Sequence, residues 1–395
     1  MGIPCIDRLG AEIEDRWRAV DYAPSAFPDL SVRFLGEADL PRQISPDDIT
    51  SFVLRTRLLP QQADPSVKFG QPPITLFRGP RFYIDALYWL DGTTSIHHHA
   101  FSGAFQVLAG SSIETVFSFE LERTFDGHFV MGSLRVLSSG LLRQGEVRPI
   151  LVGPKLIHSV FHLERPSVSI VVRTFADPSG PQLEYGHAGI GLHPFFFDEA
   201  AERKLQIVKM LKVAQHTSLE RYVGDLIAES DLHTAYRVIR ECATQGFVDR
   251  LIDRVRDKEA ADRFRQSVKD YRREALLIAR RAVVTDADLR FFLGVLLNAS
   301  RRRDVLALSR EKRPDSEPAK QVAHWLRGLS NVTIKLQVEG TPWQPSLLGL
   351  PVFDDEIEAT CAAMLSGQTT GWSDQGAGAM VKLRALPALA CLFND

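Results

Sequence analysis

The chain has 395 residues, of which 45% are hydrophobic and 24% are charged, and its formal net charge is −2. This length predicts two domains, and the near-neutral charge argues against a nucleic-acid or anionic-membrane partner. Four widely spaced cysteines without a CxxC pair argue against a zinc finger, and no apolar stretch reaches the ~20 residues that span a bilayer, so we expect a reduced, cytoplasmic protein.

The first half of the chain begins with helical segments and continues as short strands. We expect one helix over residues 6–20 and another after the turn at residues 45–48. From about residue 81, β-branched and aromatic residues gather in short runs separated by glycine-containing turns, which predicts a sandwich or barrel. The expected strands are residues 81–90, 113–121, 128–137, 147–152 and 167–175.

The period of the sequence changes near residue 195. Residues 176–194 are rich in glycine and proline and are expected to form a linker. Beyond them, apolar residues recur every three or four positions, as between Phe264 and Ile278, which indicates helices. We therefore predict an α+β multidomain protein: a β-barrel or sandwich with a helical N-terminal segment over residues 1–195, then an α-helical domain over residues 196–395.

The strongest chemical signal is the run of three histidines at His97–His99. Because side chains alternate along a strand, His97 and His99 share one face and His98 points to the other. Two imidazoles at this spacing can bind one metal ion if another strand supplies a third ligand, and His158 follows a turn at a suitable place. Three neutral imidazoles leave coordination positions open, as an oxygen-activating iron or a hydrolytic zinc requires. The alternative is an accidental run of core or surface histidines.

The residues around these histidines favour the metal site. Gly92 lies five residues before His97, Gly110 ends the first segment, and a second segment contains Gly145, Pro149, Gly153 and His158. This arrangement resembles the two-part cupin signature, and the resemblance implies that the barrel of residues 1–195 is a cupin-type β-barrel (jelly roll). The acidic ligand of ordinary cupins is missing, and Gln106 is the residue nearest to its place.

Two longer segments narrow the resemblance. Residues 89–114 (WLDGTTSIHHHAFSGAFQVLAGSSIE) and 156–175 (LIHSVFHLERPSVSIVVRTF) resemble the metal-binding stretches of the cysteine dioxygenase family of thiol dioxygenases. In that family an SIHxH strand supplies two ligands of a ferrous ion and a later LH supplies the third. The resemblance covers roughly residues 70–180 and implies one Fe(II) per chain, held by His97, His99 and His158, with a small-molecule substrate and O2 as partners.

The sequence also departs from that family. Gly103 and Ala104 occupy the region where the family often has a cysteine that crosslinks to a tyrosine. The family's Ser-His-Tyr series falls on Ser169, Val171 and Arg173, so its histidine and tyrosine are absent. The region that matches the family's carboxylate-binding arginine contains no arginine. These losses argue against cysteine as the substrate.

Other side chains are candidates for a different substrate site. Arg173 is expected to point toward the metal, where its guanidinium suits a carboxylate or phosphate, or else to pair with an acid at the barrel rim. On the expected strand of residues 81–90, Tyr83 and Asp85 share a face with Trp89. We expect these two polar side chains in the cavity, where they could bind a ligand; the alternative is that they form the polar open end of the barrel. The candidate catalytic residues are Arg173, Tyr83 and Gln106, and the candidate substrate-binding residues are Arg173, Tyr83, Asp85, Trp89 and His162.

Three functions remain open at this point. The favoured hypothesis is a mononuclear non-haem iron(II) oxygenase that acts on a small polar molecule, such as a thiol or an amino-acid derivative. A zinc- or manganese-dependent isomerase or hydrolase would differ only in the metal. The third is a small-molecule-binding cupin whose helical domain contacts a partner. A homo-oligomer is compatible with each of them, and the helical half contains no Glu-x-x-His motif of a di-iron bundle.

Overall fold

The structure, a computed structural model, describes residues 2–63, 70–90, 94–176, 180–332, 336–338, 341–343 and 346–394. It divides into two compact units: Met1–Ser118 with Leu137–Glu184, and Phe119–Val136 with Tyr185–Asp395. Residues 119–136 are the outer part of a long hairpin, and they cluster with the helices of the second unit rather than with the first unit. The domain boundary after residue 195 stays a prediction.

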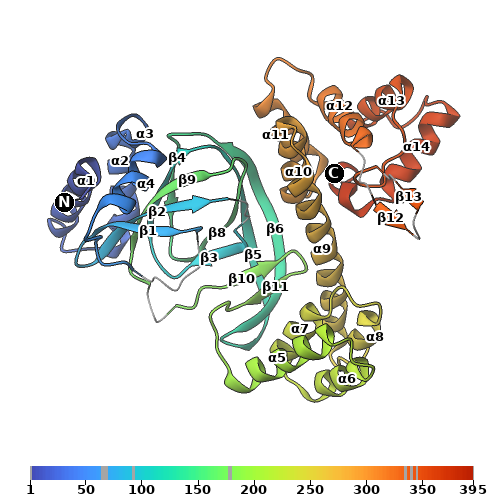
Figure 1. Cartoon of the computed structure of the whole chain (residues 1–395), viewed down its shortest axis with the longest axis horizontal. Helices are drawn as coiled ribbons and strands as arrows, with labels where there is room; N and C mark the ends of the chain where they lie inside the picture. Colours follow the sequence, from blue (N-terminus) through green and yellow to red (C-terminus); the bar gives the residue numbers. More distant parts are fainter. Residues whose placement is uncertain are drawn as a thin grey trace. The chain divides into compact units, whose positions relative to one another are not determined.

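Helices of the first unit cover one face of a sheet (Figure 1). They are α1 (Pro4–Arg18), α2 (Phe27–Ala38), α3 (Leu40–Gln43) and α4 (Pro46–Arg55), with a 3₁₀ turn at Pro24–Ala26. The expected helices near residues 6–20 and after residue 45 are thereby confirmed. α4 begins where the sequence signals it, because Ser45 and Asp48 form a reciprocal capping box at its start.

The first unit contains a five-stranded sheet of order β1-β2-β9-β4-β7. These strands are β1 (Pro73–Arg78), β2 (Phe82–Trp89), β4 (Gly103–Ala109), β7 (Val147–Ile150) and β9 (Ser167–Thr174). Alternation along β2 sends Phe82, Ile84 and Ala86 into the core shared with the helices, while Leu87 and Trp89 pack in a separate cluster on the opposite face. The sheet therefore separates a helical layer from the interior that contains the histidines.

The remaining strands form a closed barrel of order β10-β11-β6-β5-β8-β3. They are β3 (Ile96–His99), β5 (Ser112–Asp126), β6 (Phe129–Leu142), β8 (Gly153–His162), β10 (Glu184–Gly186) and β11 (Ile190–Leu192). The last two lie within residues 176–194, so the expected linker is wrong in part: Ile190 pairs with Met131 of β6. The glycine and proline residues lie mostly around these short strands. The hydrogen-bonded pairing with a distant strand outweighs the preference of this composition for irregular structure.

The second unit is α-helical, as predicted, apart from its short strands and the hairpin tip. Its helices are α5 (Glu199–Val213), α6 (Leu219–Glu229), α7 (Leu232–Glu241), α8 (Val248–Ile252), α9 (Lys258–Val283), α10 (Ala287–Asn298), α11 (Arg302–Lys312), α12 (Pro318–Asn331), α13 (Asp355–Leu365) and α14 (Asp374–Arg384), followed by a 3₁₀ turn at Pro387–Leu392. The pair β12 (Leu336–Val338) and β13 (Thr341–Trp343) is added to them. Phe264 and Val268 of α9 join the core with Phe129 and Met131 of the hairpin tip.

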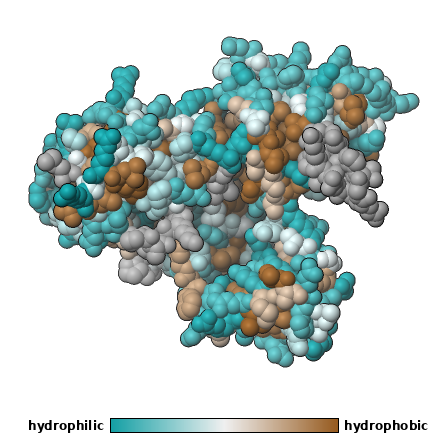
Figure 2. Space-filling view, viewed as in Figure 1, coloured by the Kyte–Doolittle hydropathy of each residue, from teal (hydrophilic) through white to brown (hydrophobic). Residues whose placement is uncertain are grey.

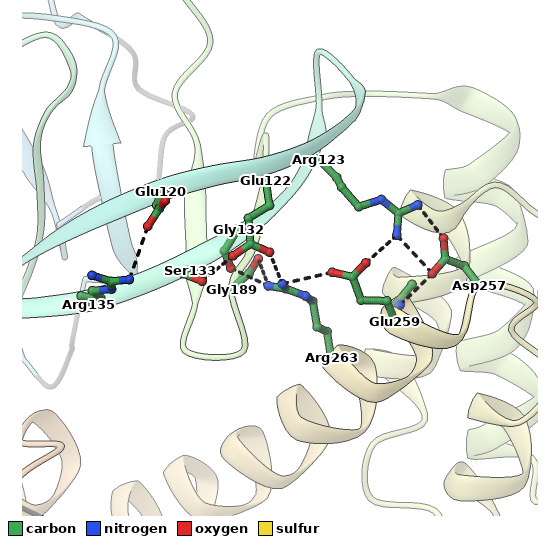
Figure 3. A network of polar contacts seen from close by, with 11 residues as sticks. Glu120, Glu122, Arg123, Gly132, Ser133, Arg135, Gly189, Asp257, Glu259 and Arg263 are labelled. Atoms are coloured by element: carbon green, nitrogen blue, oxygen red, sulfur yellow. Dashed lines mark hydrogen bonds and ion pairs between the residues drawn. The ribbon is translucent and has the colours of Figure 1, made fainter.

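Arginine side chains bind the hairpin tip to α9 (Figure 3). Arg123 lies 2.6 Å from Asp257 and 3.0 Å from Glu259. Arg263 donates to the carbonyl of Gly132 and also pairs with Glu122. These contacts span more than 130 residues of sequence, and together with the apolar core they explain why residues 119–136 belong to the second unit.

The surface of the second unit carries exposed apolar side chains. Figure 2 shows brown, hydrophobic patches on the part formed by α5–α8, and Ile207, Met210 and Val213 of α5 are among the exposed apolar residues. No helix in the described part of the chain combines the length and the hydropathy needed to cross a bilayer.

Candidate metal centre

The three predicted ligands meet on two paired strands. β3 and β8 run antiparallel, and their register places His97 directly opposite His158. His99 lies two positions after His97 and therefore on the same face, although the register shifts between these two residues. All three side chains are buried.

The ring nitrogens of these histidines converge. One nitrogen from each of His97, His99 and His158 lies within 4.8 Å of the other two. The Nε2 atoms of His99 and His158 are 3.0 Å apart, and the ring centroids of His97 and His99 are 4.5 Å apart. Two nitrogens bound to one ion at about 2.1 Å would be separated by roughly 3.0–3.4 Å, so the spacing of His99 and His158 fits a shared metal ion.

Hydrogen bonds to the opposite ring nitrogens fix two of the imidazoles. His97 Nδ1 donates to the backbone carbonyl of Ser95 at 2.7 Å, and His158 Nδ1 donates to the carboxylate of Glu114 at 2.9 Å. A proton on Nδ1 leaves the lone pair on Nε2. Carbonyl and carboxylate partners of this kind orient ligating histidines in metal sites, so both rings are prepared to coordinate through Nε2.

Two of the three histidines, His97 and His99, are held uncharged. Burial, followed by the proximity of His158, lowers the pKa of His97 to about 3. Burial also lowers the pKa of His99 well below its ordinary value, and His97, His158 and Arg173 act in the same direction. Metal ligation requires neutral imidazole. The donor set and its protonation state therefore fit a divalent metal ion.

A cavity of about 50 Å³ adjoins the three histidines. Its wall is mostly apolar and all of it belongs to the first unit: Leu87, Trp89, Thr94, His97, His99, Phe101, Phe105, Ile150, His158, Val160, His162, Ser169, Val171 and Arg173. A cavity needs about 10–15 Å³ of such volume to hold one water molecule. The cavity thus accommodates a small ligand next to the metal.

The cupin-type barrel follows from these observations. A closed antiparallel barrel holds three convergent histidines on its inner face, two from an HxH strand and one from a later strand. The first half of the chain is a cupin-type barrel. The predicted Gly92 of the cupin signature lies outside the described residues.

Three of the predicted substrate-binding residues, Arg173, Trp89 and His162, line the cavity. The guanidinium carbon of Arg173 is 3.3 Å from the ring centre of Phe101, and the Nε atom of Arg173 is buried without a hydrogen-bond partner among the described residues. Burial lowers the pKa of Arg173, although Tyr83 and Asp85 favour its charged form.

Tyr83 and Asp85 lie near Arg173 but not on the cavity wall. The ring centre of Tyr83 is 5.2 Å from the guanidinium carbon of Arg173. Asp85 is buried, and burial raises its pKa, although Thr75, Arg173 and Arg78 act in the opposite direction. Their predicted roles in catalysis and substrate binding stay predictions.

The role predicted for Gln106 is wrong. Its amide donates to the carbonyls of Leu35 and Gly145, both at 3.2 Å. Its neighbours Phe105 and Val107 pack with the cavity cluster, so alternation along β4 turns Gln106 toward the helical layer. Gln106 joins a strand to α2 and cannot reach a metal-bound ligand.

Sequence reasoning assigned no role to Glu114, which the structure places beside His158. Glu114 is buried, and its second carboxylate oxygen lies 3.3 Å from Arg148, which also pairs with Glu146 at 2.8 Å. His98 points away from the cluster as predicted, with Nε2 2.9 Å from the carbonyl of Pro181. Only the pairing of β5 with β8 identifies Glu114, and that pairing has no local sequence signal.

Comparisons with known proteins add no assignment of function. No protein-family model matches the sequence, and no curated protein matches it. Solved structures similar to parts of it include hydroquinone 1,2-dioxygenase from Sphingomonas sp. TTNP3 with 4-hydroxybenzoate bound, at 11% identity, covering 27% of this chain and 68% of that one, with a TM-score of 0.21. Oxalate oxidase with the substrate analogue glycolate matches at 20% identity, covering 25% and 43%, with a TM-score of 0.18. The capsular polysaccharide assembling protein CapF from Staphylococcus aureus matches at 19% identity, covering 28% of each chain, with a TM-score of 0.20. These likenesses are too low to carry an argument about activity.

Proposed function

We propose that the protein is a mononuclear non-haem iron(II) oxygenase that acts on a small polar molecule. The observation that carries this proposal is the convergence of three buried histidines, with ligand atoms within 4.8 Å of one another, beside a small cavity. Three neutral imidazoles hold a divalent ion and leave positions open for other ligands. The chemistry that Fe(II) supplies in such a setting is the activation of O2 together with a bound substrate.

The residues of the chain prepare the metal-binding nitrogens. The backbone carbonyl of Ser95 and the carboxylate of Glu114 accept hydrogen bonds from the Nδ1–H groups of His97 and His158, which keeps both Nε2 lone pairs directed at the cluster. Arg148 and Glu146 extend this chain of contacts from Glu114 to the surface side of the barrel. The carboxylate of Glu114 also increases the electron density of the His158 ring, which strengthens its bond to a metal ion.

Other residues of the cavity bind the substrate and exclude water. Leu87, Phe105, Ile150 and Val171 contribute apolar surface, which leaves few sites where water would be held. Arg173 supplies a positive charge on this wall and orients an anionic group of the substrate, because a guanidinium matches a carboxylate with two parallel hydrogen bonds. A polar substrate with one anionic group fits this wall.

Elemental analysis of the full chain, purified without oxygen, tests the proposal. We expect about one iron per chain in the wild type and in His98→Gln, whose changed side chain faces away from the cluster, and none in the double variant His97→Ala/His99→Ala. The iron-loaded protein should then consume oxygen with a thiol or an amino-acid-like compound, and the double variant should not.

Two outcomes contradict the proposal. Zinc or manganese in place of iron would support an isomerase or hydrolase. Folded protein without any metal would support a small-molecule-binding module whose helical unit contacts a partner.

A further inference from the structure

His162 is a buried histidine on the cavity wall that is not one of the three candidate metal ligands. It ends β8, four residues after His158, and it is 3% exposed. Its ring stacks on Trp89, with centroids 4.3 Å apart and planes 11° from parallel. Its Nδ1 atom lies 3.0 Å from the hydroxyl of Ser112, and its Nε2 atom is buried without a hydrogen-bond partner among the described residues.

Ser112 determines which nitrogen of His162 carries the proton. Ser112 is directly opposite His162 in the register of β5 and β8 and is 1% exposed. Within the described part of the chain, the only acceptor for its hydroxyl proton is His162 Nδ1. If Nδ1 carried the proton instead, the serine O–H and the Nε2 lone pair would both be buried without partners. The arrangement that leaves fewer unpaired groups has Ser112 donating to Nδ1 and the ring proton on Nε2.

Burial keeps this ring neutral. It lowers the pKa of His162 to about 3, and no nearby charge contributes. A neutral ring with its proton on Nε2 presents one hydrogen-bond donor and no acceptor to the cavity. Such an unpaired donor in an apolar setting favours a ligand that brings an oxygen acceptor.

The other polar groups of the wall point to the same class of ligand. Arg173 can only donate hydrogen bonds. Thr94 is engaged with the backbone of Val160, whose N–H it accepts at 2.8 Å. Ser169 can either donate or accept. Apart from the metal ligands and the indole of Trp89, which can only donate, the wall therefore has two fixed donors, His162 and Arg173, and no fixed acceptor.

We propose that His162 is a specificity-determining residue that donates from Nε2 to an acceptor-only oxygen of the substrate, such as a carboxylate oxygen, and that Ser112 is the positioning residue that sets its tautomer. This inference rests on the proposed function, because it takes the ligand that His162 binds to be the substrate of the proposed oxygenase. The tautomer itself requires neither metal nor turnover, so the two proposals can fail separately.

The tautomer is measured by long-range ¹H–¹⁵N correlation spectra of the full chain labelled at histidine, in metal-free and zinc-loaded forms. The His162 signals are those missing from His162→Gln. We expect His162 to remain neutral between pH 6 and 8 with the Nε2–H form at least about tenfold in excess, and Ser112→Ala to lose that excess. A wild-type ring with its proton on Nδ1, or an unchanged tautomer in Ser112→Ala, would overturn the proposal. The wild-type spectrum decides even if Ser112→Ala fails to fold.

Ligand recognition is tested with propionate as the probe in the same spectra. Propionate should shift the His162 Nε2–H signal, whereas propylammonium, which only donates, should not. His162→Gln retains a donor near the Nε2 position and should bind propionate within about threefold of wild type, whereas His162→Phe, which keeps a ring beside Trp89, should bind it at least about tenfold more weakly. Equal binding by His162→Phe and wild type would show that the donor is satisfied otherwise, for example by a resident water, and would refute the proposal.

Discussion

The carboxylate of Glu114 accepts a hydrogen bond from Nδ1 of His158 at 2.9 Å, while the other ring nitrogen of His158 faces His99 at 3.0 Å. The two residues come from adjacent strands, with Val116 of β5 directly opposite His158 of β8. Glu114 thus connects the candidate metal centre to Arg148 and Glu146. One ring nitrogen is committed to the protein and the other is left for the metal.

Replacing Glu114 should therefore weaken metal binding. We expect Glu114→Gln to lower the affinity by about tenfold, since the amide still accepts the hydrogen bond, and Glu114→Ala to lower it by up to about 100-fold, since the ring loses its orienting partner. Zinc competition with a chromophoric chelator measures both. Glu146→Gln is the matched control, because Glu146 touches Arg148 but not His158, and its affinity should equal that of wild type. Equal affinities for all four proteins would show that Glu114 serves the barrel and not the metal.

The sequence predicted the parts of this site that depend on local alternation. His97 and His99 face the same way because they are two residues apart on a strand, and the later His158 follows from the cupin resemblance. Glu114 depends on which strand lies beside β8, and Gln106 was misplaced because the facing of β4 depends on its pairing with β9. Neither strand pairing can be inferred from the residues adjacent to Glu114 or Gln106 in the sequence.

The same distinction holds for the fold. Apolar spacing was sufficient for the long helix around Phe264 and Val268. It did not reveal that Ile190 pairs with Met131, because three-residue strands are too short to show alternation. Nor did it place the hairpin tip with the helices, since that depends on partners such as Arg263, which is more than 130 residues away.

Gly103 is expected to be required by the five-stranded sheet. It has φ +155°, and a Cβ added there would lie 1.9 Å from the backbone carbonyl of Val172 on the neighbouring strand. A backbone atom in a sheet cannot move aside, so Gly103→Ala should destabilise the first unit by about 3 kcal/mol or more, or prevent its folding. Gly145 also has a positive φ, +90°, but open space around it, so Gly145→Ala should cost only about 1–2 kcal/mol. Calorimetric unfolding compares them, and equal losses would contradict the steric explanation.

Arg263 of α9 should stabilise the second unit much more than Arg135, an exposed arginine on the hairpin that Arg263 contacts (Figure 3). Its side chain is 19% exposed and bonds to the Gly132 carbonyl, Glu122 and Glu259. Arg263→Met should lower the free energy of unfolding by about 2–3 kcal/mol, because charged hydrogen bonds are lost and the Gly132 carbonyl loses a donor. Among the described residues Arg135 pairs only with Glu120, and both are about 70% exposed, so Arg135→Met should change stability by no more than about 0.5 kcal/mol. Similar effects of the two substitutions in denaturant titrations would show that Arg263 does not fasten the hairpin.

His233 should make the second unit less stable in mild acid. It is 6% exposed, and burial, followed by Arg237, lowers its pKa, while Asp126 and Asp231 oppose the shift and His128 reinforces it. The unfolded chain then binds a proton more readily than the folded chain, so stability is complete above the unfolded pKa of about 6.5 and falls as the pH drops below it.

For this one group, the loss between pH 7.5 and 5.5 is at most about 1.4 kcal/mol. His233→Gln should flatten the pH dependence of unfolding by up to that amount, leaving the contributions of His187 and His193, whose pKa values burial also lowers. Denaturant unfolding at a series of pH values measures the slopes. An identical slope in His233→Gln and wild type would mean that His233 is protonated as readily in the folded chain as in the unfolded one, against its burial beneath Phe129 and Phe196.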